Sequence, residues 1–298
     1  MSDARAHAHV LPESSAESGV LYVVATPIGN LADLTERAKD LLSSVDLVAA
    51  EDTRHTRKLL VSLGANPSML SLHDHNEQGR IAQIQTRLQA GESVALVSDA
   101  GTPLISDPGF TLVRALRDAG HRVVPVPGAC ALIAALSASG LPTDRFTFNG
   151  FLPAKSKGRR DRLQQVVQES ATQIFYESPH RIMDTLDDMM TVFGEHRDVC
   201  LARELTKTFE TFLSMPLGEL RDALVADSNQ QRGEMVLMVA GRRETDLDQA
   251  WPQAQAWLES LMPLLPLTQA CAVVARHTGI KKKALYNWAL SQSSDEDA

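Results

Sequence analysis

The chain has 298 residues, of which 44% are hydrophobic, and its formal net charge is -8 at pH 7. No apolar run reaches the roughly 18 residues that a membrane helix needs, and residues 1–19 lack the apolar core of a signal peptide. These properties exclude a membrane-spanning protein and predict a cytoplasmic one, with a disordered leader over residues 1–19. The three cysteines lie far apart in apolar surroundings, which predicts reduced core thiols and neither disulfides nor a metal site.

The segment over residues 20–140 alternates short apolar runs with amphipathic stretches. The first run, GVLYVVA, precedes a stretch in which five apolar residues fall at helical spacing: Leu31, Leu34, Ala38, Leu41 and Val45. The same cycle occurs five times, so we expect an N-terminal α/β domain with a parallel sheet and helices on both faces. Ligands of such sheets bind beyond the carboxyl ends of the strands. The residues that follow each run are therefore the candidate ligand contacts: 26–30, 51–54, 73–76, 99–105 and 127–131.

A second α/β domain with a mixed sheet is expected over residues 141–241. Its predicted strands lie in RFTFNGF, TQIFYES, VCLAREL, TFETFLS and GEMVLMVAG. The polar segment RRETDLDQ is a predicted linker, and a helical extension follows over residues 248–292. The last two helices, separated by Gly279, have the lengths of a helix-turn-helix. A simple helical hairpin fits the same pattern equally well.

The loop VSDAGTPLISDPG, residues 97–109, follows an apolar run and contains Asp99 and Asp107. A phosphate-binding loop would carry a lysine and exposed backbone donors, whereas these carboxylates repel polyphosphate and attract cationic groups. Gly101 and Thr102 allow close approach of the backbone to a ligand. The loop therefore indicates a site for a ligand with positive charge, with a plain surface turn as the alternative.

Several motifs in fixed order resemble those of the ribosomal RNA small subunit methyltransferase I family, within the tetrapyrrole methylase superfamily. They are TPIGNLADLT, EDTRHTRKLL, LHDHNE, DAGTPLISDPG, PGACALIAALSASGLP, GFLPAKSKGRRDR, FYESPHR, ARELTKTFE and GEMVL. The resemblance covers residues 20–241, and the C-terminal helices are similar to the helix-turn-helix domain appended in that family. It implies S-adenosylmethionine as methyl donor and the ribose 2'-hydroxyl of a decoding-centre cytidine in 16S ribosomal RNA as acceptor. It also implies a cleft between two α/β domains and a homodimer.

The resemblance further implies a set of donor-binding residues. The sulfonium, ammonium and ribose hydroxyls of S-adenosylmethionine suit a loop that carries aspartates. The residues implied in the first domain are Pro27, Asp99, Ala100, Gly101, Thr102, Ile105, Gly128, Ala129 and Cys130. Those implied in the second domain are Tyr176, Ala202, Arg203, Gly233, Glu234 and Met235.

Two basic segments are candidate contacts for RNA on an acidic protein. The first, beside the predicted domain junction, contains Lys155, Lys157, Arg159, Arg160 and Arg162. The second, at the start of the last helix, contains Lys281, Lys282 and Lys283. Solvated charged helix faces are the alternative for both segments.

In-line methyl transfer demands mainly that the acceptor be positioned, and a general base assists a ribose hydroxyl. The candidate catalytic residues are Glu51, Asp52, His73, His75, Glu177, Glu204 and Lys207. Capping of the following helix is the alternative for the histidines, and a favourable interaction with a helix dipole is the alternative for Glu51 and Asp52. A salt-bridge network between domains is the alternative for the last three. The two histidines alone do not complete a metal site.

Two other functions fit parts of the sequence. A tetrapyrrole methyltransferase would share the donor site and the two-domain form, but it would have little use for the basic segments. A nonenzymatic RNA-binding assembly factor would need no working donor site. Donor binding separates the second alternative from an enzyme, and the identity of the acceptor separates RNA from tetrapyrrole.

Overall fold

The computed structural model describes residues 19–242 and 244–295, and side chains within these ranges except those of residues 244–249 and 292–295. The predicted leader lies outside the described residues, apart from Gly19. The chain divides into two units. The first comprises the chain up to Ala135 together with Arg203–Thr211, and the second comprises Leu136–Ala202 and the chain from Phe212 onward.

The first unit contains the predicted parallel sheet. Its strands have the order β3-β2-β4-β1-β5, and every described pairing between them is parallel. The strands are β1 (Val20–Val24), β2 (Leu47–Ala50), β3 (Ser68–Ser71), β4 (Val94–Val97) and β5 (Arg122–Val126). The helical segments are η1 (Leu31–Asp33), α1 (Glu36–Ser44), α2 (Thr53–Ser62), α3 (Glu77–Gln89) and α4 (Phe110–Asp118). Helix α5 (Ala131–Ala138) contains the boundary between the units, after Ala135.

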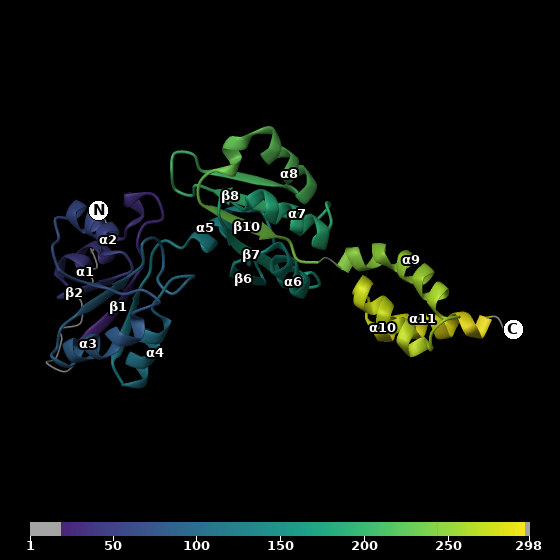
Figure 1. The fold of residues 1–298 in the computed structure, drawn as a ribbon, viewed down its shortest axis with the longest axis horizontal. Coiled ribbons are helices and arrows are strands. Elements are labelled where there is room, and N and C mark those ends of the chain that lie inside the picture. Colours follow the sequence, from purple (N-terminus) through teal and green to yellow (C-terminus); the bar gives the residue numbers. More distant parts are fainter. Residues whose placement is uncertain (1–18, 243, 296–298) are drawn as a thin grey trace, which may run out of the picture. The chain divides into compact units, whose positions relative to one another are not determined.

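Helices cover both faces of this sheet, as the alternation of strands and helices predicts (Figure 1). On β2, Val48 and Ala50 join the core formed with α1 and α2. Leu47 and Ala49 point to the opposite face, in the core formed with α3 and α4. Because all the strands run in the same direction, the loops after them gather at one edge of the sheet.

The second unit contains the predicted mixed sheet, with the order β6-β7-β10-β8-β9. Strand β7 pairs in parallel with β6 and antiparallel with β10. The strands are β6 (Phe146–Phe151), β7 (Thr172–Glu177), β8 (Asp198–Arg203), β9 (Thr211–Pro216) and β10 (Met235–Val239). The helical segments are α6 (Ser156–Val166), α7 (Ile182–Phe193), α8 (Leu217–Ala226) and η2 (Ser228–Gln231). Phe175, Leu186 and Leu220 belong to one core that these helices and strands share.

Three helices follow, α9 (Glu244–Leu261), α10 (Leu267–Thr278) and α11 (Lys282–Asp295), and they pack on one another (Figure 1). Leu258, Cys271 and Leu285, one from each helix, are fully buried in their shared core. All three cysteines of the chain are free. None of the described helices combines the length and apolarity that a membrane-spanning segment needs.

Two segments depart from the domain division predicted from the sequence. Residues 136–140, predicted in the first domain, belong to the second unit. Residues Arg203–Thr211, predicted in the second domain, belong to the first unit. For this second segment, the physical reason is a close approach to the loop after β1. A Cβ at Gly29 would lie 2.5 Å from the Lys207 side chain and 3.0 Å from the carbonyl oxygen of Leu205, so only glycine permits this packing.

Candidate functional site

The loops after β1, β4 and β5 are joined by hydrogen bonds at the carboxyl edge of the first sheet. Thr26 and Gly101 exchange backbone hydrogen bonds of 2.8 and 3.0 Å. The hydroxyl of Thr102 donates to the carbonyl of Ala129 at 2.9 Å. Gly101 has a φ of 80°, a conformation that favours glycine. The donor-binding residues predicted in the first domain therefore come from loops that are fixed to one another.

Asp99 contributes one carboxylate oxygen to this framework. Its Oδ1 accepts a hydrogen bond from the backbone N of Asp52 at 3.1 Å, which ties the loop after β4 to the end of β2. Among the described residues, no hydrogen bond is made to the second oxygen, Oδ2. One side of the Asp99 carboxylate is thus structural, and the other can accept a hydrogen bond from a ligand.

Negative charge is concentrated around Asp99. Burial raises the pKa of the Asp107 carboxyl to about 6, against the lowering effect of a hydrogen bond with Ser98, and the charges of Glu51 and Asp99 raise it further. Burial and the neighbouring Asp99 also raise the pKa of Glu51. Within residues 19–242 and 244–295, no group of three or more histidine, cysteine, aspartate or glutamate side chains could hold a metal ion. An organic cation suits this carboxylate-rich edge.

Among the catalytic candidates, Asp52 is engaged in capping α2. Its carboxylate accepts hydrogen bonds from the backbone N and the guanidinium of Arg54, at 2.7 to 3.1 Å. These contacts hold the pKa of Asp52 well below its usual range. A carboxylate with a lowered pKa is a weak base, and Asp52 lies at the N-terminus of α2, where an acidic side chain caps the helix and interacts favourably with its dipole.

The histidine pair lies before α3, and Asn76 fixes the ring of His73. The amide of Asn76 accepts from the His73 backbone N at 2.9 Å, and its Nδ2 lies 3.0 Å from His73 Nε2. An amide nitrogen can only donate, so a neutral His73 carries its proton on Nδ1, which is buried without a partner among the described residues. The His75 ring lies edge-on to it at 6.0 Å. In this tautomer Nε2 accepts a hydrogen bond from Asn76, and the Nδ1–H can donate one.

Glu177 lies in a hydrogen-bond network inside the second unit. Its side chain is fully buried, and its carboxylate accepts from Thr185 Oγ1 at 2.7 Å, the Ser178 backbone N at 2.8 Å and Arg181 at 3.3 Å. A carboxylate so enclosed has a structural role, and the network joins residues of one unit. The predicted alternative of a network between domains is therefore wrong for Glu177.

Glu204 and Lys207 form an ion pair of 3.0 Å within the segment that joins the first unit. Glu204 has a φ of 50° and Thr206 a φ of 64°. Arg203 belongs to the same segment, with 7% of its surface exposed, and donates to the carbonyl of Phe209 at 3.2 Å and to Thr211 Oγ1 at 3.3 Å. These contacts hold the segment in its strained conformation.

The remaining donor-binding candidates lie on the second sheet. Tyr176 on β7 is opposite Val236 on β10, next to the pair Met235 and Glu177. Its ring packs edge-on against Phe148 at 4.8 Å and Phe151 at 5.7 Å. Gly233 and Glu234 immediately precede β10, and Ala202 is fully buried on β8.

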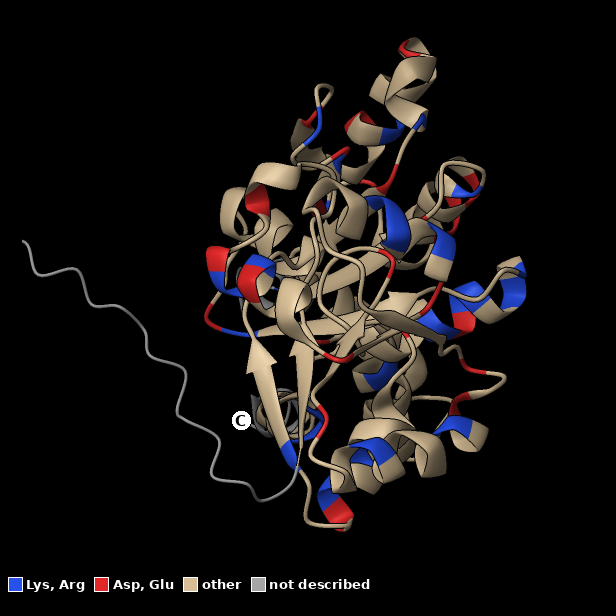
Figure 2. Ribbon diagram, turned by 90° about the vertical axis from the view of Figure 1, so that its left-hand side faces the viewer, with Lys and Arg blue, Asp and Glu red and all other residues tan. Residues whose placement is uncertain are grey.

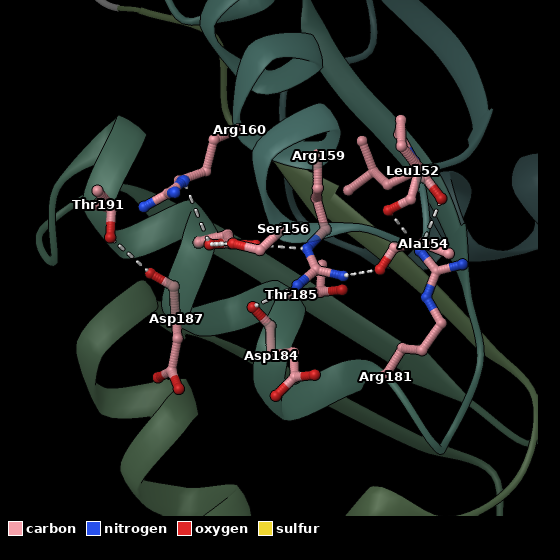
Figure 3. A network of polar contacts seen from close by, with 12 residues as sticks. Leu152, Ala154, Ser156, Arg159, Arg160, Arg181, Asp184, Thr185, Asp187 and Thr191 are labelled. Carbon is pink, nitrogen blue, oxygen red and sulfur yellow. Dashed lines mark hydrogen bonds and ion pairs between the residues drawn. The ribbon is translucent and has the colours of Figure 1, made fainter.

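The first basic segment is divided by the structure into one buried and four exposed cations. Arg159 is 3% exposed and pairs with Asp188 at 2.6 Å (Figure 3). Its guanidinium also donates to the carbonyls of Ala154 and Asp184 at 3.4 Å. A buried, paired guanidinium cannot reach a phosphate, so the predicted RNA contact at Arg159 is corrected to a structural ion pair.

The other cations of this segment remain accessible. Lys155, Lys157, Arg160 and Arg162 are exposed. Arg160 lies 3.7 Å from Asp188, and Arg162 donates to Asn149 on β6 at 3.0 Å. The same edge strand exposes Phe146 by 42% and Phe151 by 56%. Cations beside exposed aromatic rings suit the phosphates and bases of single-stranded RNA.

The second basic segment lies where α11 begins. Lys281, Lys282 and Lys283 are all exposed. Figure 2 shows basic and acidic residues interspersed along the ribbon. The chain has a net charge of -8, so these three lysines form a small local group of positive charge on an acidic protein.

Two features of the site were not predicted from the sequence. Thr56 and Thr206 have hydroxyl oxygens that are buried without hydrogen-bond partners among the described residues. Threonine is too common in helices and loops for sequence to single these out. The glycine at position 29, in TPIGN, is a nearby sequence signal from which a close approach of the backbone could have been inferred.

Two family models match the chain. One, described as Tetrapyrrole (Corrin/Porphyrin) Methylases, matches residues 20–221, and the other, described as RsmI C-terminal HTH domain, matches residues 248–293. The uroporphyrin-III-C-methyltransferase from Thermus thermophilus has a similar fold, with a TM-score of 0.51 at 19% identity over 74% of this chain and 94% of that chain. A structure of that enzyme complexed with S-adenyl homocysteine gives a TM-score of 0.52 at 19% identity, over 74% of this chain and 97% of that chain. The chain therefore has the fold of the tetrapyrrole methylases.

Curated relatives of higher identity carry the name Ribosomal RNA small subunit methyltransferase I. The protein from Escherichia coli O157:H7 is 56% identical over 92% of this chain and 96% of its own length. The Pseudomonas aeruginosa protein is 55% identical over 92% of this chain and 98% of its own. The Synechocystis protein is 47% identical over 93% of this chain and 99% of its own length. The chain belongs to the ribosomal RNA small subunit methyltransferase I family.

Proposed function

We propose that the protein transfers the methyl group of S-adenosylmethionine to the ribose 2'-hydroxyl of a decoding-centre cytidine in 16S ribosomal RNA. The observation that carries the proposal is the identity above 50%, over more than 90% of both chains, to relatives named for methyl transfer to this RNA. The cytidine and the 2'-oxygen come from the family resemblance of the motifs. The proposal places the protein in the cytoplasm as a homodimer.

The carboxyl edge of the first sheet fits the donor. Gly101 brings backbone close to the site, and Asp99 Oδ2 can accept from an ammonium or a ribose hydroxyl. The surrounding carboxylates favour the positive sulfonium. S-adenosylmethionine, when bound, supplies an activated methyl group on its sulfonium.

The chain's own contribution is to position the acceptor and remove its proton. Methyl transfer forms the new carbon–oxygen bond as the carbon–sulfur bond breaks, and the hydroxyl proton passes to a base. Glu51 is the best suited of the predicted bases, because burial and the neighbouring Asp99 raise its pKa towards neutral pH. A hydrogen bond from the Asp99 backbone lowers that pKa. Among the described residues, Glu51 makes no ion pair of the kind that Asp52 and Glu177 make with arginines. The four exposed cations of residues 155–162 and Lys281, Lys282 and Lys283 would hold the RNA backbone.

The first test is methyl transfer itself. Labelled S-adenosylmethionine is incubated with small ribosomal subunits from cells that lack this gene, and the RNA is digested to nucleosides. A labelled 2'-O-methylcytidine derivative is the expected product. Transfer to a tetrapyrrole and not to subunits or naked RNA would instead support the tetrapyrrole alternative. Absence of donor binding would support the nonenzymatic one.

The donor site has a separate test. Asp99→Asn keeps the Oδ1 acceptor for the Asp52 backbone and removes the charge. We expect affinity for S-adenosylhomocysteine, measured by calorimetry, to fall while the circular dichroism spectrum stays unchanged. Asp74→Asn, an exposed change in the same acidic region, is the matched control. Equal affinity of Asp99→Asn and the wild type would contradict the assignment of Asp99.

A further inference from the structure

A pocket of about 300 Å³ lies in the first unit, beside helix α2. Its walls come from the loop after β1, one side of α2, and Ser98 and Asp99 at the end of β4. Leu31 and Leu59 supply apolar surface, and Leu31 is 59% exposed. A small set of polar groups in a largely apolar wall is typical of sites for small organic groups.

Thr56, which lines this pocket, has an unusual hydroxyl. The residue is 3% exposed, and its Oγ1 is buried without a hydrogen-bond partner among the described residues. A helical threonine ordinarily donates to the carbonyl four residues earlier, as Thr86 does to Ala82 at 2.9 Å and Thr191 to Asp187 at 3.0 Å. A buried hydroxyl without a partner is costly, so the free Oγ1 of Thr56 indicates a partner that the protein alone does not supply.

A second such hydroxyl lies close by. The Oγ1 of Thr206 is also buried and unpartnered among the residues described, and it would lie 2.9 Å from a Cβ built on Gly29. Gly29 is itself part of the pocket wall. Two unsatisfied hydroxyls near one loop point to a ligand that carries several donors and acceptors.

The pocket wall carries charge of both signs, because Asp99 at the end of β4 and Lys58 on α2 both line it, and the cations of α2 suit an anionic part of a ligand. Lys58 lines the pocket, and Arg57 and Lys58 together line the adjoining hollow on the same helix. Both side chains are exposed, and α2 itself contains no acidic residue. These cations repel a sulfonium, whereas they attract the phosphodiester groups on either side of a nucleoside.

We propose that this pocket receives the RNA nucleoside whose hydroxyl accepts the methyl group. In this arrangement the Thr56 hydroxyl hydrogen-bonds the nucleoside, Leu31 contacts its base, and Arg57 and Lys58 neutralise the flanking phosphates. Pro27 and Asp99 belong both to the pocket and to the predicted donor set, which places the acceptor next to the donor. The inference rests on the proposed function and names the acceptor subsite for it.

The test uses the full chain with Thr56→Val, Thr56→Ser and Lys58→Gln. Valine has the shape of threonine without the hydroxyl, so the valine variant keeps the packing and has an equal or higher Tm. We expect its KM for small ribosomal subunits to rise about tenfold, since a good hydrogen bond is lost. The serine variant restores the hydroxyl and a near-normal KM. Thr111→Val and Arg117→Gln, exposed on α4 over the opposite face of the sheet, are the controls.

Affinity for S-adenosylhomocysteine separates the outcomes. An unchanged Kd with a raised KM for subunits in Thr56→Val and Lys58→Gln supports the acceptor pocket. A weakened Kd with an unchanged KM would assign the pocket to the donor and overturn the inference. Normal values of both parameters would overturn it as well. A wild-type protein that transfers no methyl to RNA overturns the proposed function itself, and that result is independent of the variants.

Discussion

Individual charged residues in this chain have roles that their residue type does not reveal. Arg159 and Arg160 are neighbours in one basic segment, yet Arg159 is 3% exposed and Arg160 has 48% of its side chain exposed. A buried Arg159 without Asp188 would carry a charge with neither water nor an ion-pair partner, so each of these two side chains needs the other to be buried. Sequence predicts a basic cluster here but not which member faces inward.

Removing one partner of this pair should destabilise the second unit. Arg159→Gln leaves the buried Asp188 with only the Ser156 hydroxyl and the longer contact to Arg160, which costs about 3 kcal/mol in the free energy of unfolding. Arg160→Gln, with an exposed and longer contact to the same carboxylate, should change it by about 1 kcal/mol or less. Urea denaturation followed by circular dichroism measures both. Equal effects of the two substitutions would refute the structural assignment of Arg159.

The raised pKa of Asp107 makes stability depend on pH. Its pKa of about 6 in the folded protein exceeds the ordinary aspartate value of 3.8, so the folded state binds the proton more tightly than the unfolded state. Its stabilising contribution is complete below pH about 4 and is lost as pH rises through about 6. Asp107→Asn should flatten the fall in Tm over this window and raise Tm at pH 7. Asp144→Asn, an exposed change, should preserve the wild-type profile.

At the scale of elements, the alternation of strand and helix determines most of the fold. The five predicted runs of the first domain all form strands. The fully buried strands β2 and β4 read as continuous apolar runs, whereas the edge strands β3 and β5 are partly exposed. The segment Arg203–Thr211 departs from this simple order, since its contacts with the loop after β1 are long-range. Nothing in the periodicity of a short polar segment predicts such a contact.

The close approach at Gly29 predicts a local structural effect. Gly29→Ala places a Cβ against the Leu205 carbonyl and the Lys207 side chain, so the segment Arg203–Thr211 must move. We expect faster hydrogen exchange and proteolysis within this segment. Gly79→Ala on α3, where a Cβ meets open space, should be neutral or stabilising. Protection of Arg203–Thr211 at the wild-type level in Gly29→Ala would show that the approach is looser than described.

For the whole molecule, RNA binding by a chain of net charge -8 has to rely on local cations. We expect the affinity for small-subunit RNA to fall as salt rises, so that log K against log salt has a negative slope. Each phosphate contact removed should reduce the magnitude of that slope by about 0.7 to 0.9. Lys155→Gln with Lys157→Gln should reduce the slope, whereas Arg117→Gln on α4 should not. Filter binding at several salt concentrations measures this. A slope unchanged in the double variant would leave residues 155–162 as a solvated helix face.

The sequence by itself determined the two α/β domains, the helical extension, and the loops in which the candidate site lies, because periodicity and turn residues are local properties. It also placed Asp99, Gly101 and Thr102 in the loop that the structure joins to the ends of β1 and β5. Only the tertiary structure decided that Arg159 and Glu177 are buried in ion pairs and that the Thr56 hydroxyl has no hydrogen-bond partner among the described residues. Burial and hydrogen bonding depend on residues distant along the chain, and no local pattern encodes them.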